Sequence, residues 1–130
     1  MVHDVGKSAL DVAVLLARPP LGADARAALR RHPALGAEMA AGALSTEQAA
    51  WVRGHHERWD GAGFPDGLAG ERIPEGARLL AVADAWDRLT ARRPRPAGGE
   101  DPLALLRREV GRRFCPRAAD ALARVLEGGP

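Results

Sequence analysis

The sequence of 130 residues has little cysteine, few aromatic side chains and no tyrosine. Its single cysteine, Cys115, cannot form a disulfide within the chain or a cysteine-based metal cluster, which fits a reducing cytosol. No apolar run approaches the length of a membrane span. The apolar residues are mostly Ala, Leu and Val, which favour helices over sheets. We therefore expect an all-α cytoplasmic protein without a membrane partner.

The chain also lacks a large excess of charge of one sign. Its formal net charge is +2, and both signs are mixed along the sequence. Its basic residues are nearly all arginines, and they are spread along the chain rather than gathered in a patch, so a nucleic-acid polymer is not an expected partner. The abundance of Ala, Arg, Gly and Pro is typical of a GC-rich bacterial genome.

We expect a single domain over residues 1–130, because the length suits one domain and no repeat or low-complexity tract divides the chain. His32-Pro33 separates two helices, since proline disfavours the α conformation in the residue before it. Ser45 followed by Gln48 forms a capping-box pattern at the start of another helix. The predicted helices cover residues 8–18, 23–31, 33–41, 45–56, 76–92, 102–110 and 116–127, with an internal linker at 94–101 before the last two.

Histidine is scarce, yet two of the four histidines are adjacent. His55 and His56 end a short predicted helix, directly before the segment 60–74, which has too many glycines and prolines for a helix or a central strand. Two imidazoles in that place suit metal ligands better than core packing. His3-Asp4 and His32 are weaker signals, because a surface His-Asp pair and a structural histidine before proline are both common.

A carboxylate interrupts an otherwise apolar turn at Asp84. Burying it is costly unless a cation or a full set of hydrogen bonds compensates. The alternative is a solvent-facing carboxylate that pairs with Arg88, four residues later on the helix. That description suits Asp87 better, so we count Asp84 among the candidate ligands.

Together the candidates offer nitrogen and oxygen donors, which suit Fe, Mn, Zn or Ni better than Ca or Mg. They are too many for one catalytic site with open positions, and they predict about two or three ions, a common device for phosphoester hydrolysis. Lys7, the single lysine of the chain, would stabilise phosphate charge. The predicted ligands are His3, Asp4, His32, His55, His56 and Asp84.

Two motifs place these residues in a known pattern. Residues 3–7 resemble the HDxGK signature of the HD phosphohydrolase superfamily, and residues 55–65 resemble the HHExxDGxGYP signature of its HD-GYP subgroup. The intervals from His3 to His32 and from His55 to Asp84 also agree with that family. The segments 73–78 and 83–90 and Arg93-Pro94 continue the resemblance, which therefore covers nearly the whole chain.

The resemblance implies an all-α HD-domain helical bundle with divalent metals, Fe or Mn first and Zn or Ni second. The family hydrolyses cyclic di-GMP, a bacterial second messenger, to the linear dinucleotide or to GMP. By position, the six candidates would be metal ligands, with Asp4 bridging two ions and acting with Lys7 in catalysis. A regulatory input from an upstream domain or a partner chain, and an oligomer, would also suit the family. The residues implied in substrate binding are Lys7, Asp60, Gly63, Phe64 and Arg93.

Three differences from the family pattern leave other interpretations open. Two residues precede His3, where the family has helices that supply a further histidine, so the bundle would lack its N-terminal helices. Phe64 stands at the tyrosine of GYP, and Arg95-Pro96 stands at the Tyr-Arg of the later RPYR element. The alternative is a catalytically impaired module that senses cyclic di-GMP or docks a signalling partner. A phosphohydrolase for another nucleotide suits the GYP-like loop less well.

Overall fold

The computed structural model describes residues 2–91 and 100–128, and within them it contains helices and no β-strand, as the sequence predicted. None of the described helices is long and apolar enough to span a bilayer. The elements are the 3₁₀-helices η1 (Val2–Ala9) and η2 (Gly70–Arg72) and the α-helices α1 (Val12–Leu16), α2 (Ala23–Leu29), α3 (His32–Ala40), α4 (Thr46–Gly54), α5 (Glu75–Thr90), α6 (Pro102–Arg108) and α7 (Pro116–Leu126).

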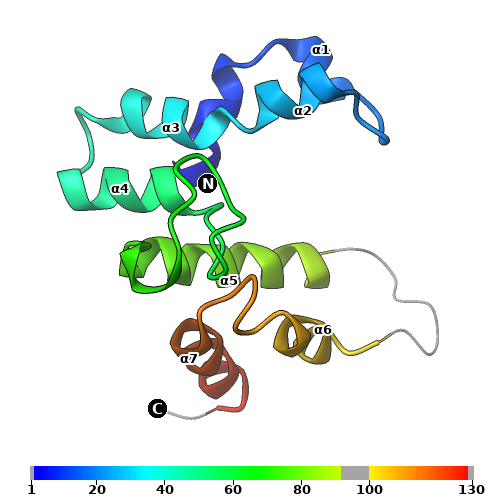
Figure 1. Ribbon diagram of the computed structural model, residues 1–130, viewed down its shortest axis with the longest axis vertical. Coiled ribbons are helices and arrows are strands. Elements are labelled where there is room, and N and C mark those ends of the chain that lie inside the picture. The colour runs from blue at the N-terminus through cyan, green and yellow to red at the C-terminus, as the bar shows by residue number, and fades with distance from the viewer. Residues whose placement is uncertain (1, 92–99, 129–130) are drawn as a thin grey trace.

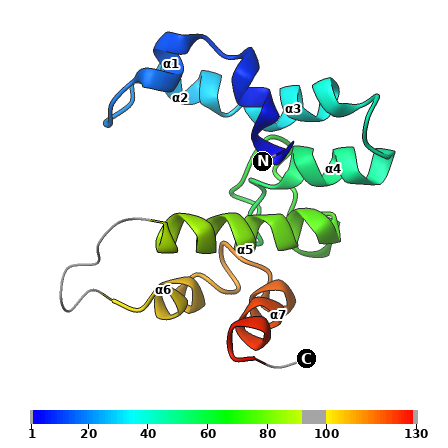
Figure 2. The same ribbon diagram turned by 180° about the vertical axis from the view of Figure 1, so that it is seen from behind.

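The helices are stacked largely in chain order (Figure 1). Helix α3 packs on α4, α4 packs on α5, and α6 and α7 cover the far side of α5. The chain begins in the middle of the stack, where η1 packs against both α3 and α4 (Figure 2). The first residues of the chain therefore lie beside the end of α4, although some fifty residues separate them in sequence.

An apolar core lies between α5 and the two C-terminal helices. Val82 and Ala85 of α5 are buried there against Leu106 of α6, Phe114 and Ala118. The small side chains on α5 and α7 let the two helices approach closely. The close packing of this core holds α5 in a fixed position. Helix α5 in turn carries Asp84 toward η1.

Most of the predicted helices begin within a residue of the expected position, and two of these starts are confirmed by side-chain caps. Ser45 and Gln48 form both bonds of the capping box, and the Asp101 carboxylate accepts a hydrogen bond from the backbone of Ala104. The prediction of one helix over 8–18 was wrong. The side chain of Asp11 caps a new helix by accepting a hydrogen bond from the Ala13 N–H at 2.7 Å, so η1 ends before it and α1 begins after it. Most of the predicted linker at 94–101 lies outside the described residues.

The contact between η1 and α3 depends on Gly6. A Cβ atom at this position would lie 1.9 Å from the carbonyl oxygen of His32 and 2.5 Å from the backbone nitrogen of Gly36. Only a residue without a side chain lets the two backbones come this close. The contact brings residues 3–7 next to His32.

Gly6→Ala is expected to lower the free energy of unfolding by at least about 1–3 kcal/mol, because the two elements would have to separate. Urea unfolding followed by circular dichroism measures the change. Gly42→Ala is the matched control, since a Cβ there meets nothing within 4 Å. Equal unfolding midpoints for the two variants would contradict the role of this contact.

Candidate metal centre and adjoining cavity

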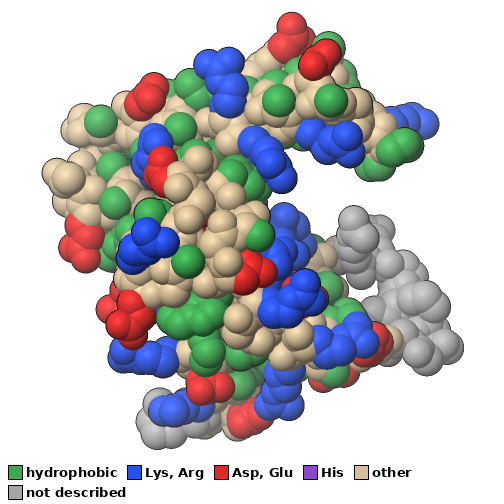
Figure 3. Space-filling model, viewed as in Figure 1, with side chains coloured by type: hydrophobic (Ala, Val, Ile, Leu, Met, Phe, Trp, Pro, Cys, Tyr) green, Lys and Arg blue, Asp and Glu red, His purple; other side chains and the backbone are tan. Residues whose placement is uncertain are grey.

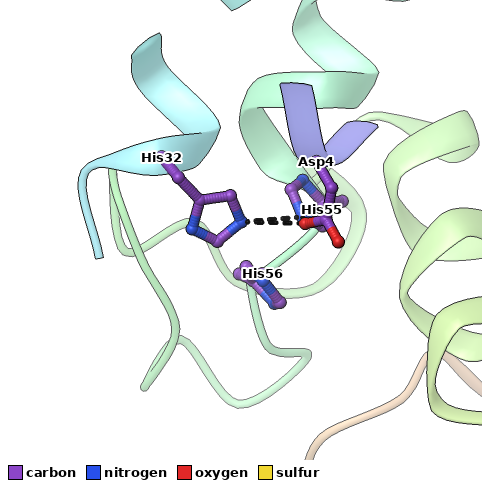
Figure 4. A group of neighbouring side chains, drawn as sticks. All are labelled: Asp4, His32, His55 and His56. Atoms are coloured by element: carbon purple, nitrogen blue, oxygen red, sulfur yellow. Dashed lines mark hydrogen bonds and ion pairs between the residues drawn. The ribbon is translucent and has the colours of Figure 1, made fainter. Parts of the chain in front are cut away.

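Asp4, His32, His55 and His56 converge on one point from three separate segments (Figure 4). Asp4 belongs to η1, His32 is the first residue of α3, and the two adjacent histidines follow the last turn of α4. One ligand atom of each lies within 4.8 Å of every other. The fold thus brings together four of the six ligands predicted from the sequence.

Hydrogen bonds to the backbone orient two of the imidazoles. His32 Nδ1 lies 2.7 Å from the Leu29 carbonyl oxygen, and His55 Nδ1 lies 2.6 Å from the Val52 carbonyl oxygen. A carbonyl can only accept, so both Nδ1 atoms donate and both Nε2 atoms carry a lone pair. The two Nε2 atoms lie 3.4 Å apart, and Asp4 Oδ1 is 3.3 Å from one and 3.9 Å from the other.

The electrostatic environment keeps these groups in the forms that bind metals. Burial lowers the pKa of His55 to about 4 and that of His56 to about 3, and it lowers the pKa of His32 as well. The three imidazoles are therefore neutral near pH 7. Burial raises the pKa of Asp4. The hydrogen bond and charge of Lys7, whose Nζ lies 2.6 Å from Oδ2, together with the neighbouring His3 and His32, outweigh this effect. The net effect lowers the pKa, so this carboxylate is ionised.

His3 and Asp84 lie together at the edge of the cluster. His3 Nε2 is 3.8 Å from Asp4 Oδ2 and 3.9 Å from Asp84 Oδ1. Asp84 also pairs with Arg88, as the alternative interpretation expected, but its side chain is only 13% exposed and faces His3. Asp87, in contrast, is exposed.

The donor set fits a transition metal. His3 Nε2 is buried and has no hydrogen-bond partner among the described residues. Two imidazole lone pairs that face each other beside a carboxylate repel one another unless a cation or a proton lies between them. Nitrogen and carboxylate donors of this kind suit Fe, Mn, Zn or Ni, and the arrangement could hold such an ion.

Glu57 anchors the loop that follows the histidine pair, a role that the sequence analysis did not assign. Its carboxylate is buried and accepts hydrogen bonds from the backbone N–H groups of Asp66, Gly67 and Leu68, at 2.7, 3.1 and 3.0 Å. A carboxylate that accepts several backbone bonds holds a loop firmly. The available signal was an acidic residue placed directly before a glycine-rich stretch.

Asp60 and Gly63 shape the same loop from within. The carboxylate of Asp60 receives two hydrogen bonds from Arg58 and one from the Ala62 N–H, and the bonds to Arg58 are the largest cause of its lowered pKa. A Cβ at Gly63 would lie 2.4 Å from the backbone nitrogen of Arg58 and 2.6 Å from the Cα of Glu57. Both residues thus fix the path of the backbone.

A cavity of about 300 Å³ adjoins the cluster and shares the walls formed by His55 and His56. Phe64 lines it, whereas Asp60 and Gly63 do not. Arg93 lies outside the described residues. The lining also includes arginines to which the sequence analysis assigned no role in substrate binding, because their positions in the sequence are far apart: Arg30, Arg58, Arg88 and Arg113.

The family model described as an HD domain matches residues 1–117 of the chain. The chain belongs to the HD domain family. A solved structure described as a cyclic GMP-AMP specific phosphodiesterase of V. cholerae superposes on this chain with a TM-score of 0.74 at 20% sequence identity. The superposition covers 97% of this chain and 36% of the solved chain. The HD-domain fold inferred from the motifs is thereby confirmed.

Curated relatives of this HD domain carry the names of cyclic dinucleotide phosphodiesterases. The cyclic di-GMP phosphodiesterase response regulator RpfG of Xanthomonas campestris is 44% identical over 95% of this chain. A probable cyclic di-GMP phosphodiesterase of Vibrio cholerae is 37% identical over 92% of it, and the 3'3'-cGAMP-specific phosphodiesterase 2 of the same organism is 34% identical over 93%. The chain spans 34%, 30% and 24% of the lengths of these relatives.

Glu57→Gln is expected to loosen the loop, since one of its two acceptor oxygens becomes an N–H₂ donor that faces backbone N–H groups. The free energy of unfolding should fall by about 1–3 kcal/mol. Amide hydrogen exchange at residues 66–68 should accelerate. Glu71→Gln, at an exposed position in the same loop region, is the control and should change neither quantity. Unchanged exchange at residues 66–68 in the Glu57 variant would show that the carboxylate does not anchor the loop.

The lowered pKa values of His55 and His56 predict acid sensitivity in chelator-treated protein. In the unfolded chain both imidazoles protonate near pH 6.5, whereas in the folded chain they do so near pH 4 and 3. The unfolded state therefore binds more protons below pH 6.5, and stability that is present above this pH is lost as the pH falls toward 4. The urea midpoint should drop over this interval, and His56→Gln should flatten the profile. Parallel profiles for the two proteins would contradict the assignment.

Proposed function

We propose that the chain is the catalytic domain of a metal-dependent phosphodiesterase that hydrolyses cyclic di-GMP to the linear dinucleotide or to GMP. The observation that carries the proposal is the convergence of Asp4 with three neutral histidines beside a cavity lined by arginines. The relatives named as cyclic di-GMP phosphodiesterases support it. We also propose that residues 1–130 form one HD-GYP-like domain of a cytoplasmic bacterial protein, regulated by another domain or chain.

The proposed metal ligands are those expected from the sequence, in two groups. Asp4, His32, His55 and His56 would hold the inner position, and His3 and Asp84 would extend the set at its edge. When bound, about two or three divalent ions, Fe or Mn first and Zn or Ni second, would polarise the phosphodiester and activate water.

The side chains of this protein would orient the substrate. Lys7 is held against Asp4 and its side chain is 42% exposed, so its ammonium group can donate to a phosphate oxygen from a fixed position. The Glu57-anchored loop keeps Phe64 in the cavity wall, where its ring lies 5.0 Å from that of His56. Arg93 is proposed as a further phosphate ligand.

A second candidate substrate is 3'3'-cGAMP. A relative that is 34% identical over 93% of the chain is named as specific for it. Both cyclic dinucleotides contain two phosphates within one ring, so the same centre would serve either. The bases distinguish them, and the cavity beside the centre would have to make that distinction.

The full chain, reconstituted with Mn or Fe, is expected to hydrolyse cyclic di-GMP, with 3'3'-cGAMP tested in parallel by chromatography of the products. Asp4→Asn should lower the rate by at least about a hundredfold and reduce the metal content measured by elemental analysis. Asp87→Asn, an equally conservative change at an exposed position of α5, is the matched control.

Two outcomes would overturn this function. Protein that binds no metal after reconstitution cannot use the proposed chemistry. Protein that binds metal and cyclic di-GMP but turns over neither dinucleotide would instead be a sensor or docking module.

A further inference from the structure

Positively charged side chains from distant parts of the sequence meet at the cavity. One follows α2, one lies in the loop after α4, one lies near the end of α5, and one lies in the turn between α6 and α7. Figure 3 shows Lys and Arg side chains gathered beside the hollow in this face of the molecule. Like charges brought together in this way repel one another, unless anions compensate them. The arginines that line the cavity are Arg30, Arg58, Arg88 and Arg113.

Two of these arginines already have carboxylate partners. Arg58 binds Asp60 through two hydrogen bonds, and Arg88 pairs with Asp84. The carboxylate of Glu57, which also lines the cavity, is engaged with three backbone N–H groups. The acidic groups at the cavity are therefore used by other partners.

The other two arginines are held by aromatic rings instead. The guanidinium carbon of Arg30 lies 5.1 Å from the centre of the Phe64 ring, and that of Arg113 lies 5.3 Å from the centre of the Phe114 ring. Within residues 2–91 and 100–128, no ion pair joins either arginine to a carboxylate. A ring fixes the direction of a guanidinium group and leaves its charge unneutralised.

The surroundings of Arg113 indicate a surplus of positive charge. The residue is exposed, yet partial desolvation, followed by the charges of Arg88 and Arg58, lowers the pKa of its guanidinium group. Glu109 and Asp84 act in the opposite direction and do not outweigh these effects. A bound anion would relieve this repulsion.

We propose that Arg30 and Arg113 form an anion subsite for the phosphate that is not being cleaved. The inference rests on the proposed function, because a cyclic dinucleotide holds a second phosphate in the same ring as the first. With one phosphate at the metal cluster, the second is directed into the cavity that shares His55 and His56 with it. A guanidinium group can bind two phosphate oxygens at once through its planar N–H groups. The bound phosphate therefore takes a defined orientation.

Calorimetric titration of the chelator-treated full chain with cyclic di-GMP tests the subsite without turnover. Arg113→Gln and Arg30→Gln should each weaken binding by about tenfold or more, the usual effect of removing a charge-assisted hydrogen bond. Arg113→Lys should keep part of the affinity, because it retains the charge without the fork. Arg124→Gln removes an equal charge from an exposed position of α7 and should change the affinity less than about twofold.

Two further ligands identify the phosphate as the group that is bound. 5'-GMP should lose affinity in the Arg113→Gln and Arg30→Gln variants, whereas guanosine should not. Unfolding midpoints by circular dichroism confirm that each variant is folded. Equal affinities of wild type and both glutamine variants, or no binding of cyclic di-GMP to the chelator-treated wild type, would overturn the subsite.

The same variants separate this inference from the proposed function. In the metal-loaded chain, Arg113→Gln should raise KM by about tenfold while kcat changes little, because the arginine contacts a phosphate that does not react. Hydrolysis that is insensitive to both arginines would leave the function intact and refute the subsite. Arginine-dependent binding of 5'-GMP without hydrolysis of either dinucleotide would refute the function and leave the subsite.

Discussion

The site depends first on the backbone contact between η1 and α3. At Gly6 the two elements approach more closely than any side chain would permit, and this places Asp4 beside His32 and His3 beside Asp84. The N-terminal ligands therefore stand on a short 3₁₀-helix that is held by packing against its neighbour, not by the hydrogen bonds of a long helix. Helix α5 completes the arrangement from the opposite side, because the apolar core fixes it against α6 and α7.

Around this frame, polar groups are oriented by the backbone. Carbonyl groups one turn earlier direct the imidazoles of His32 and His55, and burial keeps them neutral. Backbone N–H groups donate hydrogen bonds to the carboxylate of Glu57, which thereby holds the loop. Guanidinium groups on the cavity wall are held by carboxylates or by rings. Each of these polar side chains thus has a local partner that orients it in the absence of a ligand.

Local signals in the sequence predicted the all-α class and most helix starts, because a capping box or an Asp-Pro pair acts within one turn. The single helix predicted over 8–18 was wrong because the Asp11 side chain caps a new helix after η1, which an apolar pattern does not reveal. The convergence of Asp4, His32, His55 and His56 was predictable from motif spacing. The roles of Glu57 and of the cavity arginines were not, since the first depends on how one loop closes on itself and the second on segments that are far apart in sequence.

The position of Glu57 directly after His56 has a consequence for how this protein can evolve. The residue that anchors the loop and a histidine of the candidate metal centre are consecutive, so a shift of the loop would also shift this histidine. A substitution that remodels the loop for a different base would also move the imidazole beside it. Under the proposed function, substrate preference and reactivity would therefore be coupled in this loop, whereas the proposed anion subsite at the end of α2 and in the turn between α6 and α7 lies on segments remote from Glu57 in sequence.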